Sequence, residues 1–141
     1  MPDILRVFLD SNILFSVTHK PNHGFLRFWT TPEIVVMTSL YAARETRRNC
    51  KNQSQSQRLE TLLEQTVIVS AASHYARPAD IDLPAKDVPI LAAAIDASAD
   101  LLITGDKDHF SLWMNRPLKT RHGSLIIMRP RHFLDWLGHE F

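Results

Sequence analysis

Short runs of large apolar residues alternate along the chain with longer segments in which apolar positions recur at helical spacing. The short runs predict buried strands, whereas the longer segments predict helices with one apolar face. Strands are expected at Ile4 to Leu9, Ile34 to Met37, Val67 to Val69, Leu101 to Ile103 and Leu125 to Met128. This alternation favours an α/β domain with a mainly parallel sheet that is covered by helices on both faces.

Polar and proline-containing segments separate the predicted helices. The first expected helix runs from Asn12 to Thr31 and is broken at Pro21, Asn22 and Gly24, and the second runs from an N-cap at Thr38 or Ser39 to about Cys50. A third carries Leu59, Leu62 and Leu63. A fourth begins at Asp87 and Pro89, and the last lies around Phe133 to Leu137. Lys51 to Gln57 is either a loop or an exposed helical turn, and Ala76 to Pro84 has the composition of a connecting loop.

Length and composition are those of an ordinary folded protein. The 141 residues are expected to form one domain, from residue 1 to residue 141. Sixteen Lys and Arg nearly balance fifteen Asp and Glu, so any binding site for a polyanion must be local. The single cysteine, Cys50, excludes an internal disulfide and a Cys-based metal site. Because the chain shows no signal-peptide pattern and no apolar stretch of about 20 residues, we expect a cytoplasmic protein that does not span a membrane.

Acidic residues stand where the predicted strands end. Asp10 and Asp106 directly follow strands, while Glu45 and Asp87 belong to helices that should begin at the same edge of the sheet. Parallel sheets bind ligands at the carboxyl ends of their strands. We therefore expect these four carboxylates to converge on one site.

A cluster of carboxylates requires a counter-charge. Two carboxylates about 4 Å apart repel by about 4 kcal/mol at an effective dielectric constant of about 20. Either a cation or a shared proton relieves this repulsion, and hard oxygen ligands suit Mg²⁺ or Mn²⁺ better than zinc. A divalent ion in such a cluster activates water and stabilises charge on phosphate oxygens, so phosphodiester hydrolysis is the natural reaction.

Three segments together resemble the PIN-domain family. They are Val7 to Leu14, Lys86 to Ile95 and Ala99 to Asp108, in the order and spacing of that family. The resemblance implies an α/β/α sandwich with a short, mainly parallel sheet. It also implies a Mg²⁺- or Mn²⁺-dependent endoribonuclease of the kind found as the toxin of VapC-type toxin–antitoxin pairs, with RNA as substrate, an antitoxin protein as a possible partner and a possible homodimer.

The resemblance also assigns roles to individual residues. It implies that the acidic site is formed by Asp10, Glu45, Asp87 and Asp106, with Asp108 as a further metal ligand at the rim. Asn12 and Thr104 correspond to small polar residues beside the acids, where they would orient a carboxylate or hold a water molecule.

Basic residues flank the acidic ones in two stretches. Arg44, Arg47 and Arg48 lie near Glu45, and we hypothesise that they guide RNA through contacts with its phosphates. A solvated charged surface is the alternative interpretation. The second stretch comprises Arg116, Lys119, Arg121, His122, Arg129 and Arg131.

Aromatic residues at helical spacing have a structural interpretation. Phe25, Phe28 and Trp29 fall on one predicted helical face. Aromatic residues in such a stripe more often belong to a core than to a platform for nucleobases.

Each acidic residue also has a simpler interpretation. Asp10 and Asp87 could each cap a helix, Asp106 and Asp108 could form a solvated turn, and Glu45 could be a surface residue. Only the complete set argues for a metal site.

Two other functions compete with the nuclease. An aspartyl phosphatase of the haloacid-dehalogenase kind would use Asp10 as nucleophile, but it would need an acidic residue at position 12, where this chain has Asn12. The other alternative is a PIN-like module that binds RNA or protein without catalysis.

Overall fold

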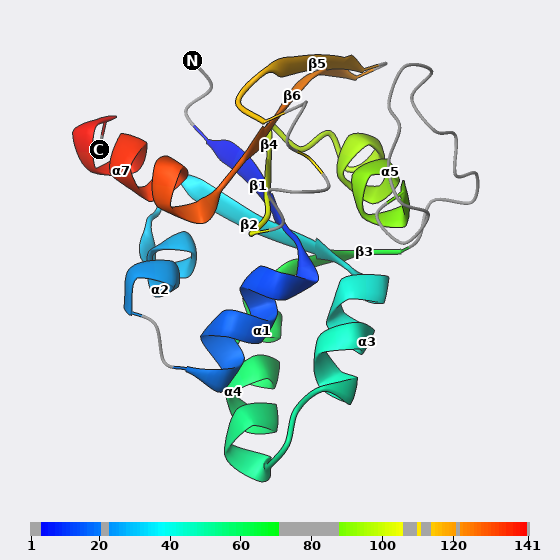
Figure 1. Cartoon of the computed structure of the whole chain (residues 1–141), viewed down its shortest axis with the longest axis vertical. Coiled ribbons are helices and arrows are strands. Elements are labelled where there is room, and N and C mark those ends of the chain that lie inside the picture. The colour runs from blue at the N-terminus through cyan, green and yellow to red at the C-terminus, as the bar shows by residue number, and fades with distance from the viewer. Residues whose placement is uncertain are drawn as a thin grey trace.

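The protein, described as a computed structural model, is built on one mixed sheet with helices packed against it (Figure 1). The structure describes residues 4–20, 23–70, 88–105, 110, 114–120 and 122–140. The strands are β1 Leu5–Leu9, β2 Ile34–Ser39, β3 Val67–Val69, β4 Leu101–Ile103, β5 Pro117–Thr120 and β6 Gly123–Met128. The helices are α1 Ser11–His19, α2 His23–Thr30, α3 Leu40–Arg48, α4 Gln53–Glu64, α5 Val88–Asp96 and α7 Pro130–Glu140.

The strands are arranged in the order β3-β2-β1-β4-β6-β5. Every pair is parallel except β5 with β6, so the expected mainly parallel α/β sheet is confirmed. In Figure 1, α2 and α7 lie on one side of the sheet and α5 on the other, as in an α/β/α sandwich. The carboxyl ends of β1, β2 and β4 therefore meet at one edge.

The central strand β1 explains why the sequence begins with an apolar run. Val7, Phe8 and Leu9 are fully buried, since helices cover both faces of the sheet. Phe8 is in register with Met37 of β2 on one side and with Leu102 of β4 on the other. Strand β1 thus holds together halves of the chain that are distant in sequence.

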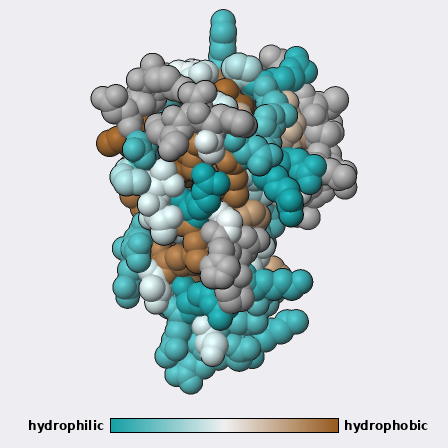
Figure 2. All heavy atoms as spheres, turned by 90° about the vertical axis from the view of Figure 1, so that its left-hand side faces the viewer, coloured by the Kyte–Doolittle hydropathy of each residue, from teal (hydrophilic) through white to brown (hydrophobic). Residues whose placement is uncertain are grey.

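Aromatic packing joins α2 to α7. The rings of Phe28 and Phe133 are stacked with centroids 5.7 Å apart and an interplanar angle of 5°, and both side chains are fully buried. Trp29 packs partly buried against the same core and donates a hydrogen bond of 2.9 Å to the Thr66 hydroxyl. The structural interpretation of these aromatic residues is confirmed. Figure 2 shows hydrophobic side chains on this side of the molecule between hydrophilic ones.

The hydrogen bonds at the start of α3 show which of the two predicted residues is its N-cap. The Ser39 hydroxyl accepts a hydrogen bond of 2.9 Å from the Ala42 amide, whereas the Thr38 hydroxyl donates to the Leu9 carbonyl. Ser39 is therefore the N-cap, and Thr38 ties β2 to β1.

Helix α4 is longer than its apolar stripe. It begins at Gln53, and the Asn52 side chain caps it by accepting from the Gln55 amide at 2.9 Å. Most of the polar stretch that was expected to be a loop or a turn is thus the exposed first half of a helix. The buried leucines Leu59 and Leu63 pack with Ala43 of α3 in a small separate cluster.

Strand β5 was not predicted from the sequence. It runs antiparallel to β6 at the edge of the sheet and alternates between exposed and partly buried residues. Its sequence, Pro117-Leu118-Lys119-Thr120, has one large apolar residue and starts with a proline, which an edge strand tolerates. The pattern is too weak to be distinguished from a loop.

None of the helices in the described part of the chain is long and apolar enough to cross a membrane.

Candidate active site

Asp10 lies where β1 ends and α1 begins. Its amide donates a hydrogen bond of 3.0 Å to the Ile103 carbonyl of β4, which fixes the backbone at the edge of the sheet. Its side chain caps α1, because Oδ1 accepts a hydrogen bond of 2.7 Å from the Ser11 amide. The side chain is only 5% exposed, so this carboxylate depends on the hydrogen-bond donors around it.

Donors from the end of β4 complete the surroundings of Asp10. The buried Thr104 hydroxyl donates to Asp10 Oδ2 at 2.9 Å and accepts from Asn12 Nδ2 at 3.3 Å. The Gly105 amide in turn donates to Asn12 Oδ1 at 3.0 Å. Asn12 and Thr104 therefore lie beside Asp10, as the resemblance implied, and together they fix the orientation of its carboxylate.

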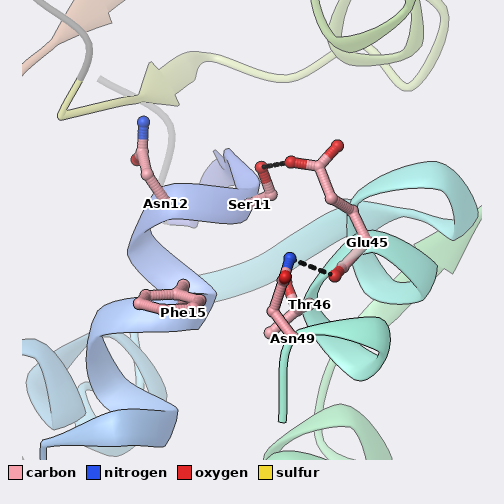
Figure 3. Close-up of a pocket in the computed structure, with 6 residues that line it drawn as sticks. All are labelled: Ser11, Asn12, Phe15, Glu45, Thr46 and Asn49. Atoms are coloured by element: carbon pink, nitrogen blue, oxygen red, sulfur yellow. Dashed lines mark hydrogen bonds between the residues drawn. The ribbon is translucent and has the colours of Figure 1, made fainter.

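Glu45 approaches the same place from α3. The Ser11 hydroxyl lies 3.1 Å from Glu45 Oε1 (Figure 3). It also lies 3.4 Å from Asp10 Oδ1, so it bridges the two carboxylates. A hydroxyl has one proton and no charge. It can therefore link Asp10 and Glu45, but it cannot neutralise their mutual repulsion.

A pocket opens directly beside this bridge. It has a volume of about 210 Å³ and lies between α1 and α3 (Figure 3). The residues that line it are Ser11, Asn12 and Phe15 of α1, and Glu45, Thr46 and Asn49 from α3 and its C-cap. We call it the α1–α3 pocket. Ser11 and Glu45 belong both to the pocket and to the acidic pair, so a ligand in the pocket lies next to the carboxylates.

Comparison with known proteins identifies the fold. No family model and no curated protein matches the chain. Solved structures do match, among them VapBC2 from Rickettsia felis bound to a DNA fragment from its promoter, with a TM-score of 0.62 and 15% identity over 89% of this chain and 98% of the other. The chain has the PIN-domain fold.

Two further structures share this PIN-domain fold. A toxin–antitoxin complex from Klebsiella pneumoniae has a TM-score of 0.61 and 22% identity over 74% of this chain and 90% of the other. The sarcin–ricin loop cleaving toxin VapC20 from Mycobacterium tuberculosis has a TM-score of 0.55 and 17% identity over 75% of this chain and 94% of the other. The fold expected from the sequence is thus confirmed, at identities that carry no residue-level assignment.

The donors at the carboxyl edge of the PIN-domain sheet fit a hard divalent cation. Asp10 and Glu45 offer carboxylate oxygens, the ligand type that Mg²⁺ and Mn²⁺ prefer. Within the described ranges, no group of three or more His, Cys, Asp or Glu side chains is close enough to hold a metal ion. The other expected ligands, Asp87, Asp106 and Asp108, lie outside the described residues.

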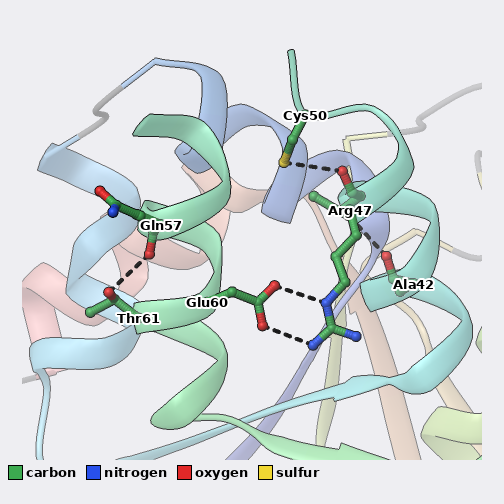
Figure 4. Close-up of polar contacts among 7 residues, drawn as sticks. Ala42, Arg47, Cys50, Gln57, Glu60 and Thr61 are labelled. Atoms are coloured by element: carbon green, nitrogen blue, oxygen red, sulfur yellow. Dashed lines mark hydrogen bonds and ion pairs between the residues drawn. The ribbon is translucent and has the colours of Figure 1, made fainter. Parts of the chain in front are cut away.

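The three arginines of α3 do not act as one group. Arg47 forms a bidentate ion pair with Glu60 of α4, with distances of 2.8 and 3.0 Å (Figure 4). The side-chain hydrogen bond between them raises the pKa of Arg47 and lowers the pKa of Glu60, and their opposite charges act in the same direction. Arg44 and Arg48 are exposed. Contact with RNA stays a prediction, and it suits Arg44 and Arg48 better than Arg47.

Sequence reasoning missed the residues that link the two carboxylates and form the pocket. Ser11 follows Asp10 directly, and Phe15 lies one helical turn after Ser11. Asn49 lies one turn after Glu45. This repeated spacing of four residues is the signal that could have placed them on facing sides of two helices. The sequence does not show that α1 and α3 face each other, because this arrangement depends on the fold.

Proposed function

We propose that this protein is a metal-dependent endoribonuclease and the toxin of a toxin–antitoxin pair. The observation that carries the proposal is the junction of Asp10 and Glu45 through the Ser11 hydroxyl at the carboxyl edge of a PIN-domain sheet. Two carboxylates from separate elements are brought together there by a neutral hydroxyl, and a bound cation would offset their repulsion.

The similar structures support the toxin role. One is described as a sarcin–ricin loop cleaving toxin, and two are described as toxin–antitoxin assemblies. By analogy, RNA is the proposed substrate and a small antitoxin protein is the proposed partner of this chain.

Asp10 and Glu45 would hold Mg²⁺ or Mn²⁺, with Asp87, Asp106 and Asp108 as the further ligands expected from the sequence. When bound, the ion supplies activation of water and neutralisation of charge on the phosphate. Asp10 is held ready for this role, because the Thr104 hydroxyl and the Ser11 amide fix both of its oxygens. This preorganisation avoids reorientation of the carboxylate during the reaction.

The phosphatase alternative is disfavoured by Asn12. Both ends of its amide are engaged, with Thr104 and with the Gly105 amide. A phosphatase with Asp10 as nucleophile needs a proton donor and acceptor at this position, and an amide cannot serve as one.

RNA cleavage tests the proposal. Wild type, Asp10→Asn and the control Asp135→Asn, in which an exposed acid on α7 is changed, are incubated with structured and single-stranded RNAs in Mg²⁺, Mn²⁺ or EDTA. Cleavage by wild type and the control with metal, but not by Asp10→Asn or in EDTA, is expected. Cleavage that persists in Asp10→Asn refutes the assigned site. Metal binding without cleavage of any RNA would favour the non-catalytic module.

A further inference from the structure

The α1–α3 pocket is only partly used by the acidic pair. Its upper wall contains Ser11 and Glu45, whereas its lower part is formed by the next helical turn of each helix, with Phe15 on α1 and Asn49 after α3 (Figure 3). This lower part takes no part in orienting Asp10. It is therefore free to bind a portion of the substrate other than the reacting phosphate.

Phe15 presents an aromatic ring to the pocket before any ligand binds. The ring is 38% exposed, although it lines the pocket. His19 stacks on it with centroids 3.7 Å apart and an interplanar angle of 19°. The two nitrogens of His19 lie 3.1 and 3.0 Å from the carbonyl oxygens of Phe15 and Asn49, and the nitrogen that bears the proton donates to its carbonyl. The stacking on His19 holds the Phe15 ring in place beside the pocket.

The hydrogen-bonding capacity left in the lower pocket includes an acceptor on Asn49. Asn49 Nδ2 donates to the Glu45 carbonyl at 2.9 Å, and since a carbonyl only accepts, the orientation of this amide is determined. Its Oδ1 remains as an acceptor, and Nδ2 keeps one further proton. Asn12 already uses both ends of its amide, and the Thr46 hydroxyl donates to the Ala42 carbonyl.

We propose that the α1–α3 pocket binds one unpaired nucleobase of the RNA, stacked on Phe15, with a base amino group directed to Asn49 Oδ1. The proposal rests on the proposed function and specifies its substrate. Proteins that bind single-stranded RNA stack unpaired bases on exposed aromatic rings. Phe15 is such a ring, already held in place next to the proposed cleavage site. A paired base cannot enter, because its faces and its amino group are already occupied.

Binding to short single-stranded RNA tests the proposal without cleavage. The parent protein is Asp10→Asn, and the probes are fluorescein-labelled cytidine and uridine pentanucleotides in Mg²⁺. Adding Phe15→Leu should weaken binding of the cytidine probe about 5- to 150-fold, the range for loss of one stacked base. Phe15→Tyr should restore it. Ile4→Ala, which changes an exposed residue before the opposite end of β1, is the matched control and should change nothing.

An abasic scan separates stacking from a general structural effect. Each nucleotide of the cytidine probe is replaced in turn by an abasic one. At one position the abasic change should weaken binding as much as Phe15→Leu does, and the two changes together should add nothing further. The proposal is overturned if the parent and Phe15→Leu bind every probe with equal affinity. It is also overturned if the effect of Phe15→Leu is the same at every abasic position. An apolar side chain of a protein partner would then be the expected occupant.

The base preference tests the Asn49 contact. Cytidine has an exocyclic amino group and uridine has a carbonyl at the same position, so cytidine should bind more tightly, and Asn49→Ala should remove the difference. Equal binding of both probes to the parent overturns this contact.

RNA cleavage by the wild-type protein with metal tests the nuclease proposal separately. RNA cleavage with an unchanged KM in Phe15→Leu refutes the base pocket and leaves the nuclease proposal intact. If binding depends on Phe15 but the wild type cleaves no RNA, the base pocket is supported and the nuclease proposal is refuted.

Discussion

Two buried threonines near the ends of the strands that flank β1 have different hydrogen-bond partners. Thr104 donates to the Asp10 carboxylate, whereas Thr38 donates to the neutral Leu9 carbonyl, both at 2.9 Å. Both residues are fully buried. A hydrogen bond to a charged group contributes more than one to a neutral group, so the pair allows the charge at Asp10 to be tested with a matched control.

Thr104→Val should lower the free energy of unfolding at neutral pH by about 1.5 to 3 kcal/mol, and Thr38→Val by about 1 kcal/mol. Denaturation in urea measures both values. Thr104→Val alone should also weaken Mn²⁺ binding about 10- to 100-fold, because the carboxylate loses the group that orients it. Equal stability losses and equal Mn²⁺ affinities in the two variants would show that Thr104 only fills space.

At the scale of elements, the ion pair between Arg47 and Glu60 joins α3 to α4. Both side chains are about half exposed, so solvent screening limits the contribution of this pair to about 0.2 to 1 kcal/mol. The hydrogen bond from Arg47 lowers the pKa of Glu60 in the folded protein. The stabilisation is therefore present above the unfolded-state pKa of glutamate, about 4.3, and is lost as the pH falls through the lower folded value.

Glu60→Gln should lower the free energy of unfolding by less than about 1 kcal/mol at pH 7 and by progressively less as the pH falls from about 5 toward 3. Urea titrations across this range measure the difference from wild type. Glu64→Gln, which changes an exposed glutamate on the same helix, is the control. A loss that is constant with pH would contradict an electrostatic origin.

The predictability of an element depends on how much of its surface is buried. Buried strands such as β1 and β4 are apolar except for the exposed Arg6 of β1, and the sequence predicts both. The exposed first half of α4 and the edge strand β5 have no such pattern, because solvent rather than a packed core faces most of their side chains.

Part of the candidate site could be predicted from the sequence. Asp10 and Thr104 directly follow strands and Asn12 comes two residues after Asp10, so the parallel sheet brings them together. Glu45 reaches them through the packing of α3 against α1, which no local pattern specifies. The bridging role of Ser11 and the position of Phe15 depend on the same packing.

At the scale of the whole molecule, stability depends on the contact between α2 and α7. The stacked pair of Phe28 and Phe133 connects a helix near the start of the chain to one near its end. Phe133→Ala should lower the free energy of unfolding by about 3 to 5 kcal/mol, the usual range for removing a buried phenylalanine.

Urea denaturation followed by circular dichroism measures this loss. The conservative variant Phe133→Leu, which keeps much of the buried volume, should lose less. A loss below about 1 kcal/mol in both variants would show that α7 contributes little to the core.

The hydrogen bond between Thr104 and Asp10 spans 94 positions of sequence, and this has a consequence during protein synthesis. A nascent chain that has emerged only as far as α5 contains Asp10 but neither Thr104 nor β4, the strand that flanks β1 on one side. Domains generally fold as units as they leave the ribosome. If the proposed function holds, the ribonuclease would thus remain inert beside the RNA-rich machinery that makes it until β4 has been translated.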